Sequence, residues 1–311
     1  MRAQAFDEYG GLDVLDLREV DMPVPGAGEV LVRVAFVTLN PIEWKIRSGA
    51  LAAMLPIDFP VILGNEISGV VDQVGAGVEA FQVGDRVAGF VRGRGDAEYV
   101  LSTPDRLAAV PDALSLRRAA TIPQGVETAR RSIDLLEVHP GETVLVNAAA
   151  GSVGSAAVQM LVGMGATVIG TASLDNHDYL RTLGATPVEY GPRLLEQVAQ
   201  VAPQGIDKAL DGGGRGFVDQ VLTILPPERI ITIADFSAVG KGVQLANGDP
   251  LALYADSFRA EITLAAEDRF TTQIAAEFAF EDLPAAQTMS EAGHLRGKIL
   301  VRVADLDAEI S

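Results

Sequence analysis

The pattern of hydrophobic and polar positions changes once along the chain. Over residues 1–120, short apolar runs are separated by turns rich in glycine and proline. Such runs are typical of β-strands, and their spacing favours a partly closed β-barrel. From Val126 onward the pattern becomes helical, and from Thr143 strand-like and helix-like segments alternate. This alternation predicts a doubly wound parallel sheet, so we expect an α/β fold.

The same pattern sets the limits of the expected elements. In the first part we predict strands at residues 3–6, 15–19, 29–38, 67–74 and 86–90, with 29–38 only half-buried. In the second part we predict strands at residues 143–146, 167–170, 187–190, 206–210, 229–236 and 242–246, and helices at residues 155–164, 178–183, 194–201 and 217–225. A helix over about 250–267 leads to strands at 271–280 and 298–303, which flank an acidic helix start and rejoin the first domain. The predicted domain limits are 1–121, 122–267 and 268–311.

The most informative stretch runs from Thr143 to Thr171. A short apolar strand is followed by a turn of small residues, a helical pattern and a second strand. Gly151 lets the backbone approach a pyrophosphate, and Gly154 lets the helix pack closely on the strand. Ala149 stands where the first glycine of the usual fingerprint would be, so a plain tight turn remains the alternative. Strand, helix and strand in this order favour a dinucleotide site at the helix N-terminus.

Composition narrows the classes of protein that the chain can belong to. Its 311 residues suit two domains, and the net charge of −18 opposes binding to nucleic acid or to an anionic membrane. No apolar run approaches the ~20 residues that span a bilayer, and the first residues do not resemble a signal peptide. We therefore expect a cytoplasmic protein. The chain has no cysteine, which excludes disulfides and thiolate-bound metals.

Several stretches together resemble one superfamily. They are residues 40–49, 63–71, 83–87, 149–154 and 296–300, which cover nearly the whole chain in order. They resemble the medium-chain dehydrogenase/reductase superfamily, specifically its zinc-free NADPH:quinone oxidoreductase (zeta-crystallin-like) branch. The resemblance implies a Rossmann doubly wound parallel sheet inserted into a GroES-like, partly closed β-barrel domain.

The residues at the places of zinc ligands indicate the branch. Zinc-dependent relatives carry cysteine where Asn40 stands and histidine where Asn65 stands. A neutral amide oxygen is a poor zinc ligand, because it has neither the charge of a thiolate nor the softness of an imidazole. The three histidines, His139, His177 and His294, are not spaced for a shared metal. We therefore predict no metal site.

The end of the second Rossmann strand indicates the cofactor. NAD-specific units place an acidic residue there, whereas this chain reads Thr171-Ala172-Ser173. Four nearby side chains could donate hydrogen bonds to the 2′-phosphate of NADP: Ser173, Asn176, His177 and Arg181. The alternative is that these residues only cap the helix that begins near Asp178. Asp175 lies close and a lysine common in the family is missing, but the pattern favours NADP.

The resemblance also assigns contacts to individual residues. It implies that Thr128, Asn40 and Lys45 meet the nicotinamide side of the cofactor. Further cofactor contacts are implied for Ala150, Gly151, Ser152, Val153, Gly154, Thr171, Gly212, Ala234 and Phe236, the last two at the end of the fifth strand. Walls of the substrate pocket are implied for Trp44, Ile46, Met54, Phe90 and Val91. The run Gly93-Arg94-Gly95-Asp96 departs from the family pattern beside this pocket.

The chemistry open to such a site is hydride transfer from NADPH to a quinone or an α,β-unsaturated carbonyl. The oxygen that gains negative charge then needs hydrogen-bond donors, and Asn40, Lys45 and Asn65 are our candidates. Lys45 has an alternative interpretation, as a surface lysine packed near Trp44. Two other functions remain open: an enoyl reductase dedicated to one pathway, and a weakly catalytic NADP-binding redox sensor or interaction protein. The edge strand at 242–246 favours a homodimer.

Overall fold

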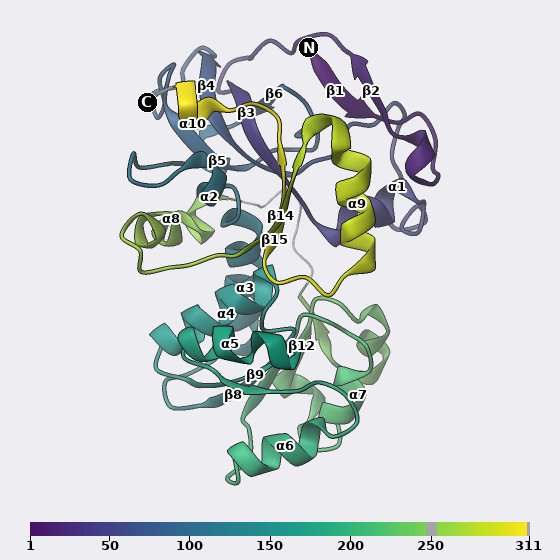
Figure 1. Cartoon of the computed structure of the whole chain (residues 1–311), viewed down its shortest axis with the longest axis vertical. Helices are drawn as coiled ribbons and strands as arrows, with labels where there is room; N and C mark the ends of the chain where they lie inside the picture. The colour runs from purple at the N-terminus through teal and green to yellow at the C-terminus, as the bar shows by residue number, and fades with distance from the viewer. Residues whose placement is uncertain (247–253, 310–311) are drawn as a thin grey trace. The chain divides into compact units, whose positions relative to one another are not determined.

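The computed structural model describes residues 1–246 and 254–309 (Figure 1). The chain divides into two compact units, and each is described by itself. Unit 1 comprises residues 1–124 together with 250–311, and unit 2 comprises residues 125–249. None of the helices in the described part of the chain is long and apolar enough to cross a membrane.

Unit 1 is built on a seven-stranded sheet. Its strands follow the order β14-β15-β3-β4-β5-β7, and β6 also pairs with β3. All pairs are antiparallel except β14 with β15. The strands are β3 (Val30–Leu39), β4 (Glu66–Val74), β5 (Arg86–Phe90), β6 (Tyr99–Ser102), β7 (Leu107–Ala109), β14 (Ile274–Ala279) and β15 (Lys298–Arg302). Because β15 pairs with β3, the end of the chain rejoins the first domain, as predicted. A smaller sheet pairs β1 (Arg2–Ala5) with β2 (Asp16–Glu19).

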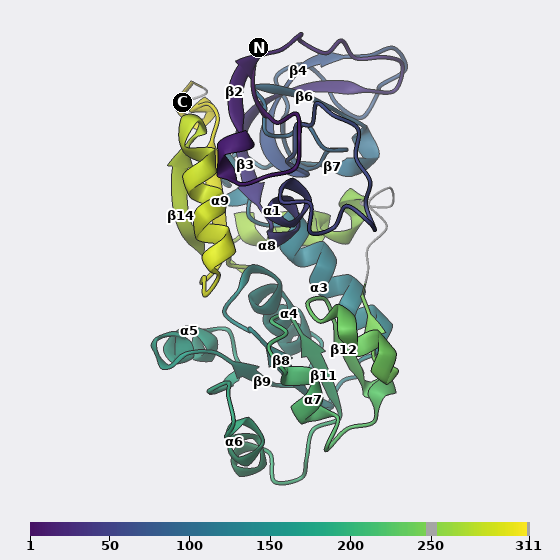
Figure 2. The ribbon, with the colours of Figure 1, turned by 90° about the vertical axis from the view of Figure 1, so that its right-hand side faces the viewer.

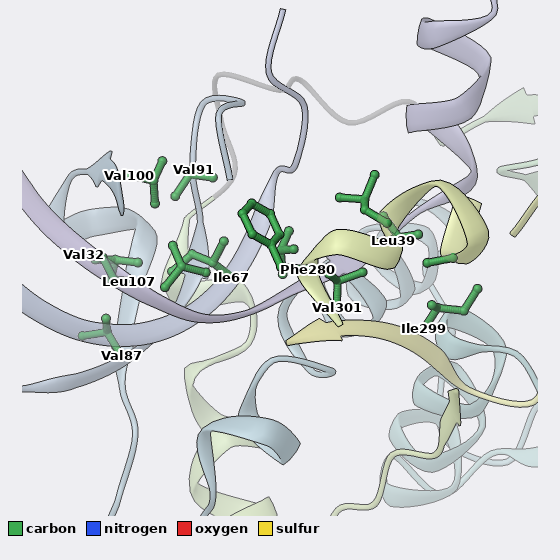
Figure 3. Packing of buried hydrophobic residues seen from close by; sticks show 14 of the residues in the cluster. Val32, Leu39, Ile67, Val87, Val91, Val100, Leu107, Phe280, Ile299 and Val301 are labelled. Atoms are coloured by element: carbon green, nitrogen blue, oxygen red, sulfur yellow. The ribbon is translucent and has the colours of Figure 1, made fainter. Parts of the chain in front are cut away.

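The core of unit 1 surrounds β3. Every residue of β3 except Arg33 is buried, so the prediction of a half-buried strand was wrong. The strand pairs with β4, β6 and β15, and helices α2 (Leu116–Ala119) and α9 (Leu283–Ala292) pack against it. Figure 3 shows side chains from β3, β4, β5, β7 and β15 gathered around Phe280. Burial on both faces explains why its sequence is nearly continuous in apolar residues.

Short helices and strands of unit 1 escaped the sequence analysis. Helix α1 (Pro41–Arg47) has seven residues, too few for an amphipathic period to stand out. Its start is nevertheless regular, because Asn40 takes the extended conformation of an N-cap and Pro41 occupies the first turn. Helix α9 lies alongside β14 and β15 in both views of the ribbon (Figures 1 and 2).

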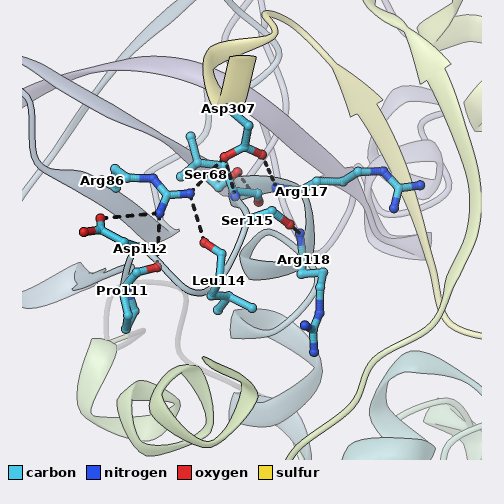
Figure 4. Close-up of polar contacts among 10 residues, drawn as sticks. Ser68, Arg86, Pro111, Asp112, Leu114, Ser115, Arg117, Arg118 and Asp307 are labelled. Atoms are coloured by element: carbon cyan, nitrogen blue, oxygen red, sulfur yellow. Dashed lines mark hydrogen bonds and ion pairs between the residues drawn. The ribbon is translucent and has the colours of Figure 1, made fainter. Parts of the chain in front are cut away.

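A polar cluster joins the C-terminal segment to the body of unit 1 (Figure 4). One carboxylate oxygen of Asp307, in α10 (Leu306–Glu309), accepts hydrogen bonds from the Leu116 amide at 3.0 Å and from Arg86 at 2.9 Å. Leu116 is the first residue of helix α2, and the Ser115 hydroxyl caps this helix by accepting a hydrogen bond from the Arg118 amide. A carboxylate at the first turn of α2 satisfies N–H groups that the helix leaves without acceptors.

Unit 2 is a doubly wound parallel sheet, which confirms the predicted fold class. Its strand order is β10-β9-β8-β11-β12-β13, and every pair is parallel. The strands are β8 (Thr143–Asn147), β9 (Thr167–Thr171), β10 (Thr186–Val188), β11 (Lys208–Asp211), β12 (Ile230–Thr232) and β13 (Gln244–Leu245). The helices are α3 (Pro123–Leu136), which begins at the end of unit 1, α4 (Ser152–Gly163), α5 (His177–Thr182), α6 (Leu194–Val201) and α7 (Phe217–Val221). The order reverses at β8, which pairs with β9 on one side and β11 on the other.

Several predicted limits differ from the structure, some of them by more than two residues or in the kind of element. Strand β12 ends at Thr232 rather than at 236, because the Thr232 hydroxyl accepts the amides of Ala234 and Asp235 and turns the chain. Helix α7 ends at Val221 rather than at 225. Of the predicted helix at 250–267, residues 250–253 lie outside the described residues, and the rest forms a 3₁₀ turn (Ala255–Ser257) and helix α8 (Arg259–Ala266). These residues pack with unit 1, where the Phe258 ring meets Phe90 edge to face.

Candidate functional site

The turn between β8 and α4 forms a cradle for an anion in unit 2. Gly151 is the N-cap of α4, so the helix begins at Ser152, three residues before the predicted start. The cap has no side chain, and the first-turn N–H groups of a helix have no intrahelical acceptors. A Cβ at Gly154 would lie 2.3 Å from the Ala148 carbonyl oxygen, so only glycine fits there. The small residues thus bring the helix N-terminus and its positive dipole end close to the strand end.

A buried hydrogen-bond network joins four strand ends beside this turn. The Asn147 side chain donates to Asp211 at 2.7 Å and accepts from the Thr171 hydroxyl at 2.6 Å. The other carboxylate oxygen of Asp211 accepts from the Thr232 hydroxyl at 2.8 Å. These residues end β8, β9, β11 and β12, and they fix the turn at the point where the strand order reverses. Ligands of open α/β sheets bind at this point.

The sequence analysis named Thr171 and Gly212 in this network but missed Asn147, Asp211 and Thr232. These three residues could have been found in the sequence, because each is a polar residue that directly follows apolar residues at the end of a strand. Asp211 also holds the glycine turn that follows β11, since its carboxylate accepts the amides of Gly213 at 3.0 Å and Gly214 at 2.8 Å. Gly212 therefore lies in a turn set by a buried side chain.

The residues predicted to select NADP lie together after β9. The Asn176 side chain donates to the Ser173 hydroxyl at 3.0 Å, and neither side chain caps the helix that follows. Arg181 is exposed and pairs with the exposed Asp178 at 2.6 Å. His177 begins α5 and is partly buried. The helix-capping alternative is therefore not realised by these side chains.

The remaining cofactor residues of unit 2 occupy three places. Thr128 is buried in α3, where its hydroxyl donates to Glu127 at 3.2 Å. Ala150 is buried within the turn before α4, and Ser152 and Val153 form the first turn of that helix. Ala234 lies in the turn after β12. Phe236 was predicted to end the fifth strand. It instead begins a 3₁₀ helix (Phe236–Lys241), and its side chain is exposed.

A second polar cluster lies inside unit 1. Lys298, at the start of β15, is almost fully buried and pairs with Glu66 at 2.7 Å. Its ammonium also donates to the Asn40 side-chain oxygen at 2.6 Å. The other oxygen of Glu66 accepts the Gln124 amide at 2.7 Å, and the Thr38 hydroxyl donates to the same carboxylate. A buried pair of this kind is held by its hydrogen bonds, because both charges have lost their contact with water.

Lys298 fixes the orientation of the Asn40 side chain. An ammonium can only donate, so the atom facing it must be the amide oxygen. The Asn40 amide nitrogen is buried, and it has no hydrogen-bond partner within residues 1–246 and 254–309. A buried donor without a partner is uncommon in proteins, and a bound ligand can supply the missing acceptor. The cluster therefore presents an oriented N–H donor.

Two carboxyl groups next to this cluster are buried and have no ion-pair partner among the described residues. Glu43 and Asp96 are each 1% exposed, and neither oxygen of Glu43 has a hydrogen-bond partner in the described part of the chain. Burial raises the pKa of Asp96 to about 7. Burial also raises the pKa of Glu43 well above its usual range, and the charge of Asp96 raises it further, although Lys298 and Asn40 lower it. Asp96 lies against Gly64, where a Cβ would be 2.7 Å from its carboxylate oxygen.

The other predicted residues of unit 1 divide between helix α1 and the loops. Lys45 is in α1, with its ammonium 5.6 Å from the centre of the Trp44 ring. The Asn65 side-chain oxygen accepts the Gly93 amide at 3.2 Å, so Asn65 anchors a loop. Ile46 is half-buried in α1 and Met54 is exposed.

The structure places Phe90 and Val91, two of the predicted walls of the substrate pocket, inside unit 1. Both are fully buried, and Val91 lies beside Val100 in the core of unit 1 (Figure 3). Phe90 packs against Phe258 with ring centroids 5.4 Å apart. Both side chains are directed into the core by the end of β5, and the exposed positions of this segment begin at Arg92.

Comparisons with known proteins identify the family. The alcohol dehydrogenase GroES-like domain matches residues 26–112, and the zinc-binding dehydrogenase domain matches residues 183–301. The chain belongs to the medium-chain dehydrogenase/reductase superfamily. Quinone oxidoreductases are among its homologues.

Individual relatives match over different shares of their length. The chain is 36% identical over 197 residues to the dehydrogenase pigH of Monascus ruber, which covers 56% of this chain and 53% of that protein. It spans about half the length of the first curated relatives that it matches. The quinone oxidoreductase from Coxiella burnetii is 28% identical with a TM-score of 0.84, over 98% of this chain and 99% of that one. The CurK enoyl reductase is 26% identical with a TM-score of 0.87, over 97% of this chain and 99% of that one.

Among the described residues, no group of three or more His, Asp or Glu side chains could hold a metal ion. Asn40 and Asn65 have other contacts: the oxygen of Asn40 faces an ammonium, and the oxygen of Asn65 faces an amide N–H. Neither oxygen is charged, and both already accept a hydrogen bond. The donor set at these two positions therefore does not fit zinc.

Proposed function

We propose that the protein is an NADPH-dependent reductase that transfers hydride to a quinone or an α,β-unsaturated carbonyl without zinc. The observation that carries the proposal is the cradle at the start of α4, where Gly154 brings a helix N-terminus to the switch point of a Rossmann sheet. In a chain of this superfamily, such a cradle fits the pyrophosphate of a nicotinamide dinucleotide. The absence of cysteine and the asparagines at positions 40 and 65 support a reaction that does not use zinc.

The choice of NADP rests on the side chains after β9. Ser173, Asn176 and Arg181 are hydrogen-bond donors at a strand end without an acidic residue, and the first two do not cap a helix. Two charge-assisted contacts to a 2′-phosphate would favour NADP by about two orders of magnitude. Fluorescence titration should therefore give at least tenfold tighter binding of NADPH than of NADH. Equal affinities would contradict this choice.

The oxygen of the substrate needs donors as it gains charge. NADPH supplies a hydride from C4 of its dihydronicotinamide when bound. We propose that the Asn40 amide N–H, oriented by Lys298, is the principal donor to that oxygen, with Lys45 and Asn65 as further donors. One well-placed donor of this kind contributes about 3 kcal/mol to the transition state. The final proton can come from water.

Steady-state kinetics with two substrates test the reaction and separate the alternatives. We expect NADPH consumption with both a simple naphthoquinone and a linear enone. Reduction of the enone alone would favour an enoyl reductase dedicated to one pathway, an alternative that the likeness to the CurK enoyl reductase supports. NADPH binding without reduction of either substrate would favour a weakly catalytic redox sensor or interaction protein.

The proposed partners follow from the same account. They are a small-molecule quinone or enone and a second copy of this chain, whereas the net charge of −18 disfavours nucleic acid and anionic membranes. We propose the cytoplasm as the compartment, because the reaction needs a supply of reduced cofactor. Fractionation that finds the protein elsewhere would overturn this assignment.

A further inference from the structure

A cavity on unit 1 is lined by arginine side chains. It has a volume of about 180 Å³, is partly open to solvent, and lies between the loop at 92–94, strand β6 and the 3₁₀ turn Pro104–Arg106. Its polar lining includes Arg92, Arg94, Arg106, Tyr99, Ser102 and Glu29. Three guanidinium groups around one cavity are unexpected in a chain whose net charge is −18.

The charges of this lining are unbalanced. Arg92 and Arg94 are exposed, and neither has an ion-pair partner in the described part of the chain. Arg106 is 1% exposed, and its guanidinium lies 6.0 Å from the centre of the Tyr254 ring. Glu29 supplies the one carboxylate among the lining residues, and it accepts the Gly26 amide at 2.9 Å. Even with Arg106 left out of the count, Arg92 and Arg94 outnumber the one carboxylate of the described lining, which therefore has an excess of positive charge.

The loop that carries two of these arginines is held in a fixed conformation. The Gly93 amide donates to the Asn65 side chain at 3.2 Å, and the Arg94 amide donates to the Ile62 carbonyl at 3.0 Å. Arg94 has a φ of 67°, in the left-handed region that residues other than glycine seldom adopt. Such a strained conformation persists where the surrounding contacts hold it, often in ligand sites. The backbone thus sets where the Arg92 and Arg94 side chains begin.

We propose that this cavity binds the carboxylate or phosphate group of a small molecule. The planar guanidinium of arginine can donate two parallel hydrogen bonds to either group. Thr103, also in the lining, carries a hydroxyl that can donate as well, whereas the Ser102 hydroxyl already donates to the Phe90 carbonyl at 2.8 Å. The buried Arg106 in the same lining distinguishes this cavity from a chance group of surface arginines. The site does not depend on which substrate the protein reduces.

Calorimetric titration with pyrophosphate and with citrate tests the proposal and distinguishes phosphate from carboxylate. NADPH is kept at saturation so that pyrophosphate cannot occupy the cradle of α4. The variant is Arg92→Gln/Arg94→Gln. The control is Arg193→Gln, which removes an exposed arginine of unit 2 that has no ion pair among the described residues. Thermal melting of each variant verifies that it is folded.

We expect the wild type to bind at least one of the two anions, and the double variant to bind it at least about tenfold more weakly. The control variant should keep the wild-type affinity, and all three proteins should bind NADPH equally. Binding should weaken as salt is added, since part of the site is exposed. No binding of either anion, or equal affinity in the double variant, would overturn the proposal. Failure to bind NADPH would instead count against the proposed function, and the titrations without NADPH would still report on this cavity.

Discussion

At the scale of single residues, the buried charges of unit 1 are the most unusual feature. The Glu66 carboxylate has an ammonium, a hydroxyl and an amide N–H as partners, whereas the Glu43 carboxyl group has no hydrogen bond among the described residues. Burial without a partner favours the neutral form of a carboxyl group, and burial with a lysine favours the charged form. Glu43 in α1 and Glu66 in β4 are therefore both buried, but only Glu66 has a cation beside it to offset its charge.

Kinetics of Asn40→Ala and Lys45→Met test the proposed donors. Removing a donor to the developing oxyanion should lower kcat/KM by about a hundredfold. We expect this loss for Asn40→Ala and for Lys45→Met, with a quinone and with an enone. Lys241→Met is the control, because it removes an exposed lysine paired with Asp219 and should change kcat/KM less than about twofold. If kcat/KM of Lys45→Met is unchanged for both substrates, the Lys45 ammonium is not a donor to the substrate oxygen.

Asp96→Asn should make stability less sensitive to pH. The pKa of Asp96 is raised from 3.8 to about 7 in the folded chain, so the folded state keeps a proton that the unfolded state releases between these values. The free energy of unfolding of the wild type therefore falls as pH rises from about 4 to about 7. Between about pH 5 and pH 8, the variant should gain roughly 2 kcal/mol or more relative to the wild type. Chemical denaturation at both pH values measures this gain.

The exposed Asp105→Asn provides the control for this measurement, since it removes a carboxyl group of the same unit that is in contact with water. A difference between Asp96→Asn and the wild type that does not vary with pH would show that Asp96 is ionised throughout the range. That result would contradict the burial of an uncompensated carboxyl group.

At the scale of elements, the turn between β8 and α4 is the feature on which the proposed nucleotide binding depends. Its sequence alone predicted a dinucleotide site, because the tight turn and close helix packing both depend on glycines that are visible in the chain. The helix start was predicted three residues late. In a pattern of hydrophobicity, Ser152 and Gly154 look like turn residues. Their backbone is nevertheless helical, because the helix begins directly after its N-cap, Gly151.

Gly154→Ala should weaken nucleotide binding and destabilise unit 2. The added Cβ would lie 2.3 Å from the Ala148 carbonyl oxygen, and the three nearest atoms all belong to the backbone of Ala148 and Ala149, so no flexible side chain can move aside. We expect NADPH affinity to fall by at least about tenfold and the fold to lose roughly 1–3 kcal/mol. Fluorescence titration and thermal melting measure the two effects.

Gly163→Ala is the matched control in the same helix. Nothing lies within 4 Å of the Cβ that it would add, so the change should be neutral or stabilise the helix by up to about 1 kcal/mol. Wild-type NADPH affinity in Gly154→Ala would show that the close approach of α4 to the turn is not needed by the nucleotide.

The sequence could not predict the parts of the site that depend on distant pairing. Glu66 and Lys298 both lie in stretches that carry the family resemblance, but only the pairing of β15 with β3 and of β3 with β4 brings them into contact. The burial of Phe90 and Val91 could not be predicted either, because an apolar side chain at a strand end fits a core as well as a pocket wall. Helix α1 was missed, since its seven residues contain too few turns to show a period.

At the scale of the whole molecule, the open question is how copies of the chain assemble. The parallel sheet of unit 2 has β10 at one edge and β13 at the other. The Ala246 amide donates to Thr232 in β12, so the Leu245 amide, one residue earlier, points away from β12 to the open edge. An unpaired strand edge is a template for pairing with another chain.

We predict a homodimer that joins the two β13 edges. Light scattering at micromolar concentration should give twice the mass of one chain. Leu245→Pro removes the outward N–H without removing a bond to β12, and it should shift the protein to the monomer. Gln244→Ala, at the neighbouring position, should remain a dimer. A monomeric wild type, or a Leu245→Pro variant that stays dimeric, would contradict pairing at this edge.

The most direct test of the whole account is NADPH turnover by exhaustively chelated protein. Asn40 and Asn65 offer neutral oxygens that already accept hydrogen bonds, and the chain has no cysteine, so the site has no ligand set for zinc. We predict that the chelated protein reduces a naphthoquinone with NADPH at the rate of the untreated protein and melts at the same temperature. Loss of activity that zinc specifically restores would contradict the proposed mechanism.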